Sequence, residues 1–291
     1  MKKIRFVLPA LAAVAALALA GCTNSEGPSE GTDGGTETTA ANIVTFDDIK
    51  AAGVLVIATD AEYPPNEYKD EDGNPTGWGV ELANAIAEQL GVEPEWEIMG
   101  FDGILPRIEE GVVNMGASSF TDNAERQKTV DFVNFLNAGS QWAAPVGSNV
   151  DPENACGLTV AVQQGTVQHT DELPAKSKAC TDAGEAEIVI LPFDGQPEVT
   201  NAVIHGQADA FSADSPVTGD AVAKTDGQLE LAGEMFDAAP YGFAVQKGSG
   251  MAEVVRDALQ ALMDNGTYLR ILTEAGVEAG ALDAATINAG S

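Results

Sequence analysis

Arg126 lies in a setting that suits a bound anion. It follows the apolar run VVNMGASSF, whose end supplies the hydroxyl groups of Ser118 and Ser119. The pattern predicts a helix that begins near Asp122, and the free backbone N–H groups at a helix start favour negative charge. A carboxylate bound there would also accept a pair of hydrogen bonds from the guanidinium group.

Asp214 could bind the opposite charge. It ends the run ADAFSA, and its carboxylate, with oxygens from residues 117–119, could accept hydrogen bonds from an ammonium group. Together with Arg126 it would hold a zwitterion. Each residue also has a simpler interpretation: Arg126 could pair with Glu125 or Asp131 at the surface, and Asp214 could cap the next helix.

These residues stand at the ends of strands that alternate with helices. VLVIATD, EWEIM, VVNMGAS, LTVAVQQG, EIVILPF and ADAFSAD read as strands, and GVELANAIAEQLG and SPVTGDAVAK are among the predicted helices. The alternation predicts two α/β units with largely parallel sheets, in which ligands bind beyond the carboxyl ends of the strands. Asp60 and Thr166 also lie at such ends, although Asp60 could be a turn residue and Thr166 a helix cap.

The N-terminal segment is typical of export. Residues 1–21 have a basic start and an apolar stretch of signal-peptide length. LAGC (19–22) resembles a bacterial lipobox, so we expect Cys22 to be lipidated; an ordinary signal peptide with a chance cysteine is the alternative. Residues 22–41 would then be the lipidated Cys and a disordered tether. We expect a protein anchored by lipid at the extracytoplasmic face of the cell membrane.

Composition and motifs exclude several classes of function. A formal net charge of −31 over 291 residues argues against nucleic acid as a partner and favours a soluble monomer. The sequence contains no nucleotide-binding glycine motif, no GxSxG and no HExxH, and it has only two histidines. We therefore expect no catalysis, no cofactor and no metal.

Cys156 and Cys180 form an even pair in an exported chain, which favours a disulfide. Closing that loop would contribute about 3 kcal/mol to stability. Metal binding by the pair is the alternative interpretation.

Several motifs, in this order, resemble one known family. They are VLVIATDAEYPPNEYKDEDGNPTGWGVELANAIAEQLG, FDGILPRIEEG, SSFTDNAERQKTVDF, VAVQQGT, GQADAFSAD and YGFAVQKGSG. The chain resembles the amino-acid-binding (family 3) solute-binding proteins of ABC importers from about residue 43 to 280. The resemblance implies a type II periplasmic-binding-protein-like α/β fold with two sheets joined by two hinge strands. Lobe 1 would comprise residues 42–139 plus 240–291, and lobe 2 residues 140–239.

The resemblance also implies roles for single residues. Arg126 would bind the ligand α-carboxylate and Asp214 the α-ammonium. The other expected ligand-binding residues are Asp60, Tyr63, Phe101, Ala117, Ser118, Ser119, Thr166 and Val167. The chain departs from the family pattern at Asn66, where an aromatic residue often stacks on the ligand, at Val167, where Thr is frequent, and in two additional residues before Arg126.

The resemblance implies an extracytoplasmic binding protein that captures an amino acid and delivers it to a membrane permease. Asp60, Glu62 and Glu67, with Asn66 in place of an aromatic, favour a polar or cationic ligand side chain. One alternative is an enzyme on the same scaffold, a dehydratase or cell-wall hydrolase that would use Glu62 or Glu67 as a general acid. Another is a sensory ligand-binding module.

Overall fold

A computed structural model describes residues 43–291. The predicted signal peptide, Cys22 and the whole of the predicted tether lie outside the described residues. Within the described range, no helix combines the length and the apolar character that a membrane span requires.

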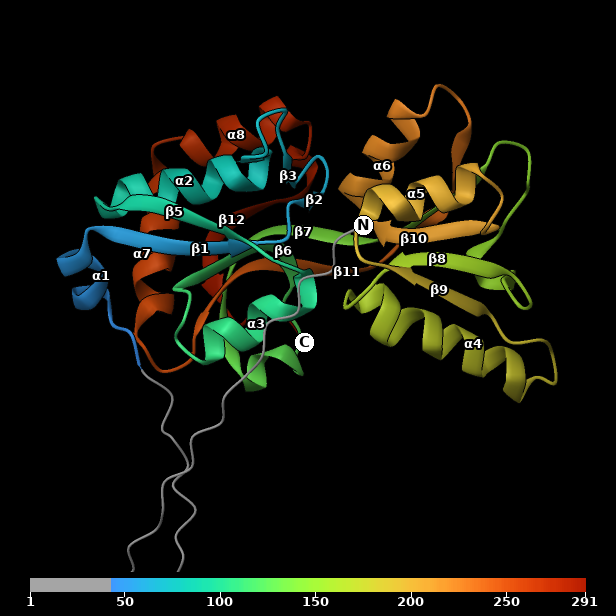
Figure 1. The fold of residues 1–291 in the computed structure, drawn as a ribbon, viewed down its shortest axis with the longest axis horizontal. Coiled ribbons are helices and arrows are strands. Elements are labelled where there is room, and N and C mark those ends of the chain that lie inside the picture. The colour runs from blue at the N-terminus through green and yellow to red at the C-terminus, as the bar shows by residue number, and fades with distance from the viewer. Residues whose placement is uncertain (1–42) are drawn as a thin grey trace, which may run out of the picture. The chain divides into compact units, whose positions relative to one another are not determined.

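The first group of elements, here called the β1 half, surrounds a central strand (Figure 1). β1 (Val54–Thr59) pairs in parallel with β5 (Glu93–Ile98) and with β6 (Met115–Thr121). Five helices cover these strands: α1 (Phe46–Ala52), α2 (Trp78–Leu90), α3 (Phe101–Glu109), α7 (Met251–Asp264) and α8 (Thr267–Ala275). Figure 1 shows α2 and α8 side by side on one face of the strands.

The second group, the β8 half, repeats this plan. β8 (Thr159–Gln163) pairs in parallel with β9 (Val189–Phe193) and β10 (Ala210–Asp214). Its helices are α4 (Leu173–Asp182), α5 (Gln196–Ile204) and α6 (Ser215–Lys224).

Two long antiparallel strands connect the halves. β7 (Val130–Pro145) pairs with β10 in the β8 half, and β11 (Leu229–Gln246) pairs with β6 in the β1 half. Because β7 and β11 also pair with each other, the two predicted sheets form one nine-stranded sheet within residues 43–291, in the order β5-β1-β6-β11-β7-β10-β8-β9 with β12 (Ala281–Ile287) on β7. The predicted α/β fold class is confirmed. The predicted lobe boundaries fall inside β7 and β11 and stay a prediction.

A small second sheet lies close to the site. It consists of β2 (Glu62–Tyr63), β3 (Glu67–Lys69) and β4 (Pro75–Thr76) in antiparallel order. β4 leads directly into α2, whose apolar face packs in the main core of the β1 half. The segment before α2 is therefore fixed against the core, and the side chains that it carries have defined positions.

The disulfide between Cys156 and Cys180 is present in the structure, which excludes the alternative of a metal site formed by this pair. Cys180 is the last-turn residue of α4 that faces the core of the β8 half. The bond joins α4 to the segment before β8, so it stabilises this half internally.

Candidate functional site

A small cavity of about 10 Å³ lies where the two halves meet. Both halves contribute to it. Its lining residues are Tyr63, Phe101, Ser119, Thr121, Arg126, Gln163, Thr166, Val167, Gln168 and Asp214. The structure thus brings most of the predicted ligand-binding residues together with Thr121, which ends the same strand, and it adds Gln163 and Gln168, which the sequence reasoning missed.

The predicted helix start before Arg126 is wrong. Residues 119–121 belong to β6, and only a short 3₁₀ turn, Arg126–Lys128, follows. The Asn123 side chain accepts a hydrogen bond from the Arg126 backbone N–H at 2.9 Å, a local bond that competes with helix formation. The segment before Arg126 therefore offers no helix N-terminus to an anion, and its positive charge comes from the guanidinium group.

The guanidinium group of Arg126 is held by backbone carbonyls of both halves. Nη1 donates to the Thr121 oxygen at 2.9 Å and Nη2 donates to the Gly165 oxygen at 3.1 Å. The group also lies 5.6 Å from the centroid of the Phe101 ring, within cation–π distance. An arginine has five donors, so further N–H groups can bind a carboxylate in the cavity.

Burial lowers the pKa of Arg126 to about 10, against the opposing effect of Asp214 and other acids. It is therefore a cation at neutral pH. The alternative of a surface ion pair with Glu125 or Asp131 is wrong, because among the described ion pairs Glu125 binds Lys128 and Arg126 faces the cavity.

Ser119 reaches the cavity through a break in the strand. It has a left-handed backbone with φ 48°, which is unusual and costly for a residue other than glycine. The pairing of β6 with β11 shifts register between Gly242 and Ala244, opposite this segment. Ala117 and Ser118 do not line the cavity, and the Ser118 hydroxyl instead accepts the N–H of Asp60 at 3.2 Å.

Asp214 supplies a buried carboxyl group on the opposite wall. It precedes α6, but its side chain makes no capping hydrogen bond, so the helix-cap interpretation is wrong. The carboxyl accepts a bond from Gln168 Nε2 at 2.8 Å, and the backbone N–H donates to the Tyr63 hydroxyl at 3.1 Å. Burial raises the pKa of Asp214, while the Tyr241 hydroxyl, the Gln168 amide, the Tyr63 hydroxyl and the charge of Arg126 oppose the rise.

Gln168 adds a second acceptor beside Asp214. Its Nε2 donates to Asp214 and, at 3.0 Å, to the Ser140 hydroxyl. Its Oε1 is buried and has no hydrogen-bond partner among residues 43–291. An ammonium group in the cavity would satisfy that oxygen, because a buried acceptor without a donor is costly.

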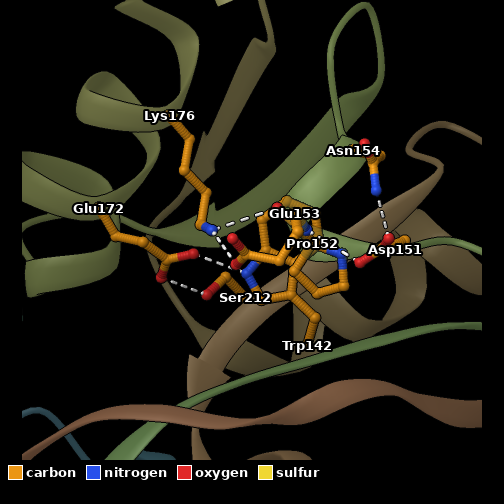
Figure 2. Close-up of polar contacts among 8 residues, drawn as sticks. All are labelled: Trp142, Asp151, Pro152, Glu153, Asn154, Glu172, Lys176 and Ser212. Carbon is orange, nitrogen blue, oxygen red and sulfur yellow. Dashed lines mark hydrogen bonds and ion pairs between the residues drawn. The ribbon is translucent and has the colours of Figure 1, made fainter. Parts of the chain in front are cut away.

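Figure 2 shows Glu172 of the β8 half with its two hydrogen-bond donors. It accepts hydrogen bonds from Trp142 Nε1 at 2.6 Å and from the Ser212 hydroxyl at 2.7 Å, one on each oxygen. Ser140 also acts to lower the pKa of this group. Burial raises the pKa of Glu172, and these donors, together with the nearby Lys176, oppose the rise. The group thus acts as an acceptor for Trp142 and Ser212.

Asp60 lies just outside the cavity wall. Its carboxyl is buried, accepts the N–H of Glu62 at 2.9 Å as a turn residue would, and also accepts from Gln163, which does line the cavity. Burial raises the pKa of Asp60 to about 6. One neutral amide therefore separates a buried anionic group from the ligand space.

Of the remaining positions, some are buried outside the cavity and others line it. Asn66 is fully buried and does not line the cavity; its Oδ1 accepts from Trp78 Nε1 at 2.8 Å. Tyr63 and Phe101 are the aromatic residues that do. Thr166 caps the turn that follows β8, accepting the His169 N–H at 3.3 Å, and it also lines the cavity beside Val167.

Comparisons with known proteins agree with this geometry. Residues 55–276 match the model for bacterial extracellular solute-binding proteins, family 3. The chain is 42% identical to the arginine-binding protein ArgT of Corynebacterium glutamicum over 238 residues, covering 81% of this chain and 78% of that protein.

Solved structures are similar as well. An ancestral arginine-binding protein bound to arginine superposes with a TM-score of 0.69 at 34% identity, covering 76% of this chain and 97% of that one. The ancestral amino acid-binding protein AncCDT-1, a precursor of cyclohexadienyl dehydratase, gives a TM-score of 0.66 at 29% identity, covering 79% and 98%. The chain belongs to family 3 of the bacterial extracellular solute-binding proteins, and it is an extracytoplasmic amino-acid-binding protein of the ABC-transporter type.

Proposed function

We propose that this protein captures a cationic amino acid, with arginine as the leading candidate. The observation that carries the proposal is Asp60, a buried carboxyl group that has only the Gln163 amide between it and the ligand space. In a pocket that already binds an α-carboxylate and an α-ammonium, a further buried anion favours a positively charged side chain.

The named relatives support this choice. ArgT and the ancestral structure are described as arginine-binding, and both match most of this chain. We assign the carboxylate end of the ligand to Arg126 and Ser119, and the ammonium end to Asp214 and Gln168. Each end then offers partners of opposite charge or polarity, which gives orientation as well as affinity.

Isothermal titration tests the proposal with three probes: L-arginine, L-glutamine and agmatine, which lacks the carboxylate. We expect L-arginine to bind at least tenfold more tightly than either of the others, since each loses one charged contact. Asp60→Asn should remove the preference for arginine over glutamine. If glutamine binds as tightly as arginine to the unaltered protein, the proposal of a cationic ligand is wrong.

We also propose that the protein is a binding protein without turnover, a monomer, and lipid-anchored through Cys22. The acids nominated for an enzyme are poorly placed, because Glu62 pairs with Lys69 at the surface and Glu67 does not line the cavity. Incubation with prephenate should give no product.

Cys22→Ala should release the protein from cell membranes, and a membrane-bound variant would contradict the anchor.

A further inference from the structure

Three side chains beside the cavity form a hydrogen-bonded chain whose direction is fixed. The Trp78 indole nitrogen can only donate, so the Asn66 atom that faces it at 2.8 Å is the oxygen. The amide nitrogen of Asn66 therefore faces Ser119, and it donates to the Ser119 hydroxyl at 3.0 Å. One of the two acceptor positions of Ser119 Oγ is thus occupied.

Glu67 lies at the other side of the same hydroxyl. Both of its carboxyl oxygens are 3.0 Å from Ser119 Oγ, and the side chain is fully buried. Gly79 of α2 leaves room for it, since a Cβ there would lie 2.1 Å from Glu67 Oε1. The N–H of Gly79 does not serve the carboxyl group, because it donates to the Asn66 backbone oxygen at 3.0 Å.

No cation balances Glu67. It takes part in no ion pair among residues 43–291. The charged groups that act on it include Asp60, just after β1, and Asp214 on β10, both like charges, and Tyr241 on β11 also interacts with it. Burial and these acids raise its pKa well above the usual value, against hydrogen bonds from the side chain and backbone of Ser119. A buried carboxyl in such surroundings takes up a proton.

We propose that Glu67 is a positioning residue that stays protonated and donates a hydrogen bond to Ser119. The Ser119 hydroxyl then donates its own hydrogen bond to the ligand α-carboxylate. Asn66 and Glu67 then fill both acceptor positions of the Ser119 oxygen. The hydroxyl hydrogen has to point elsewhere, and Ser119 lines the cavity. An ionised Glu67 would instead take that hydrogen and place a second negative charge beside the ligand carboxylate.

The inference deepens the proposed function, because it rests on the ligand carboxylate lying at Ser119 and Arg126. Protonation of Glu67 in the ligand-free protein is, however, independent of which amino acid binds. An ionised Glu67 in the ligand-free protein would therefore contradict this inference and leave the proposed function unaffected. Conversely, a failure to bind arginine would not change what is measured on Glu67.

Infrared difference spectroscopy on the ligand-free protein is the first test. At pH 7 we expect the C=O stretching band of a protonated carboxyl group, and glutamate-specific ¹³C labelling should shift it, which separates it from Asp60 and Asp214. The band should vanish in Glu67→Gln and persist in Glu172→Gln, the matched control. Absence of the band, or its loss only in Glu172→Gln, overturns the proposal.

A second measurement does not depend on the Glu67 variant. Asn66→Asp cannot donate to Ser119 and would accept its proton instead, so L-arginine binding should weaken by about tenfold or more. Asn149→Asp makes the same chemical change at an exposed residue and serves as the control. Unaltered binding in Asn66→Asp would show that the direction of the Ser119 hydrogen bond has no role in binding.

Discussion

Two glutamates stand behind the two walls of the cavity, and they differ in what surrounds them. Glu172, in the β8 half, receives donors on both oxygens from Trp142 and Ser212. Glu67, in the β1 half, is fully buried, has the Ser119 hydroxyl as its side-chain neighbour and is reached by Trp78 only through Asn66. Glu172, with a separate side-chain donor on each oxygen, serves as an acceptor, while Glu67, whose side-chain partner is the Ser119 hydroxyl alone, becomes a donor.

This difference matches the polarity of the two walls. Glu172 acts electrostatically on Ser140, which accepts from Gln168 Nε2. That contact fixes the Gln168 amide so that its oxygen is left for an ammonium group. Glu67 acts in the opposite sense on Ser119 and leaves a hydrogen for a carboxylate. Each acid thus lies behind the side chains of its own wall, in surroundings that match the polarity of that wall.

Removal of the charged group at the donor wall should have the largest effect. Arg126→Ala leaves the ligand carboxylate without its cation, and we expect a loss of about 2–4 kcal/mol in binding free energy. Titration calorimetry with L-arginine measures it. Lys128→Ala, two residues away and exposed, is the control and should bind normally. An equal loss in both variants would mean that the arginine acts only through long-range charge.

The same substitution at the two glutamates should have effects of opposite sign on stability. Glu172→Gln places an amide N–H against the Trp142 or Ser212 donor, which should lower the free energy of unfolding by about 1–3 kcal/mol. Glu67→Gln should raise it, because the folded wild-type protein has to keep a buried acid protonated. Urea unfolding at pH 7 measures both variants.

The increase in the free energy of unfolding expected for Glu67→Gln should depend on pH, because the pKa of Glu67 is raised. The folded state binds a proton that the unfolded state releases above pH 4.5, so the wild type loses stability as pH rises. The advantage of Glu67→Gln should therefore grow between pH 5 and pH 8. A constant or shrinking advantage would contradict a protonated Glu67.

Asp60 should make arginine binding depend on pH. Its pKa is about 6, and a cation requires the ionised form. At pH 5 about a tenth of these groups are ionised, so affinity should be about tenfold weaker than at pH 8. In Asp60→Asn this slope should disappear. A slope that persists in the variant would assign the titration to another group.

Lys176 should give the smallest effect. It is partly buried, pairs with Glu153 at 3.0 Å and contributes to the electrostatics of Glu172. Lys176→Met should cost less than about 1 kcal/mol, as is usual for pairs near the surface. A larger loss would show that the acceptor role of Glu172 depends on this charge rather than on Trp142 and Ser212.

The sequence predicted the placement of charge better than the direction of hydrogen bonds. Arg126 and Asp214 follow strands whose apolar pattern is clear, and parallel strands bring such ends together. The helix before Arg126 was mispredicted, because Asp122 bonds to Asn134 and to the Gly290 N–H, long-range contacts that no local pattern contains. Gln168 gave no signal beyond its position after a strand.

The pair of Asn66 and Glu67 could not have been assigned from sequence. Their partner Ser119 lies more than 50 residues away, and their burial depends on the small sheet before α2. The departure from the aromatic pattern at Asn66 was visible, but its consequence was not: the residue packs beneath the cavity surface.

The two walls are carried by different halves, and only the paired ribbon of β7 and β11 continues from one to the other. Bending or twisting that ribbon would move the two walls apart. An amino acid held at its carboxylate and its ammonium end would then lose all contacts with one wall in a single movement. Unloading would then need a change of angle rather than the stepwise rupture of individual bonds, and a transporter could drive it by pulling on either half.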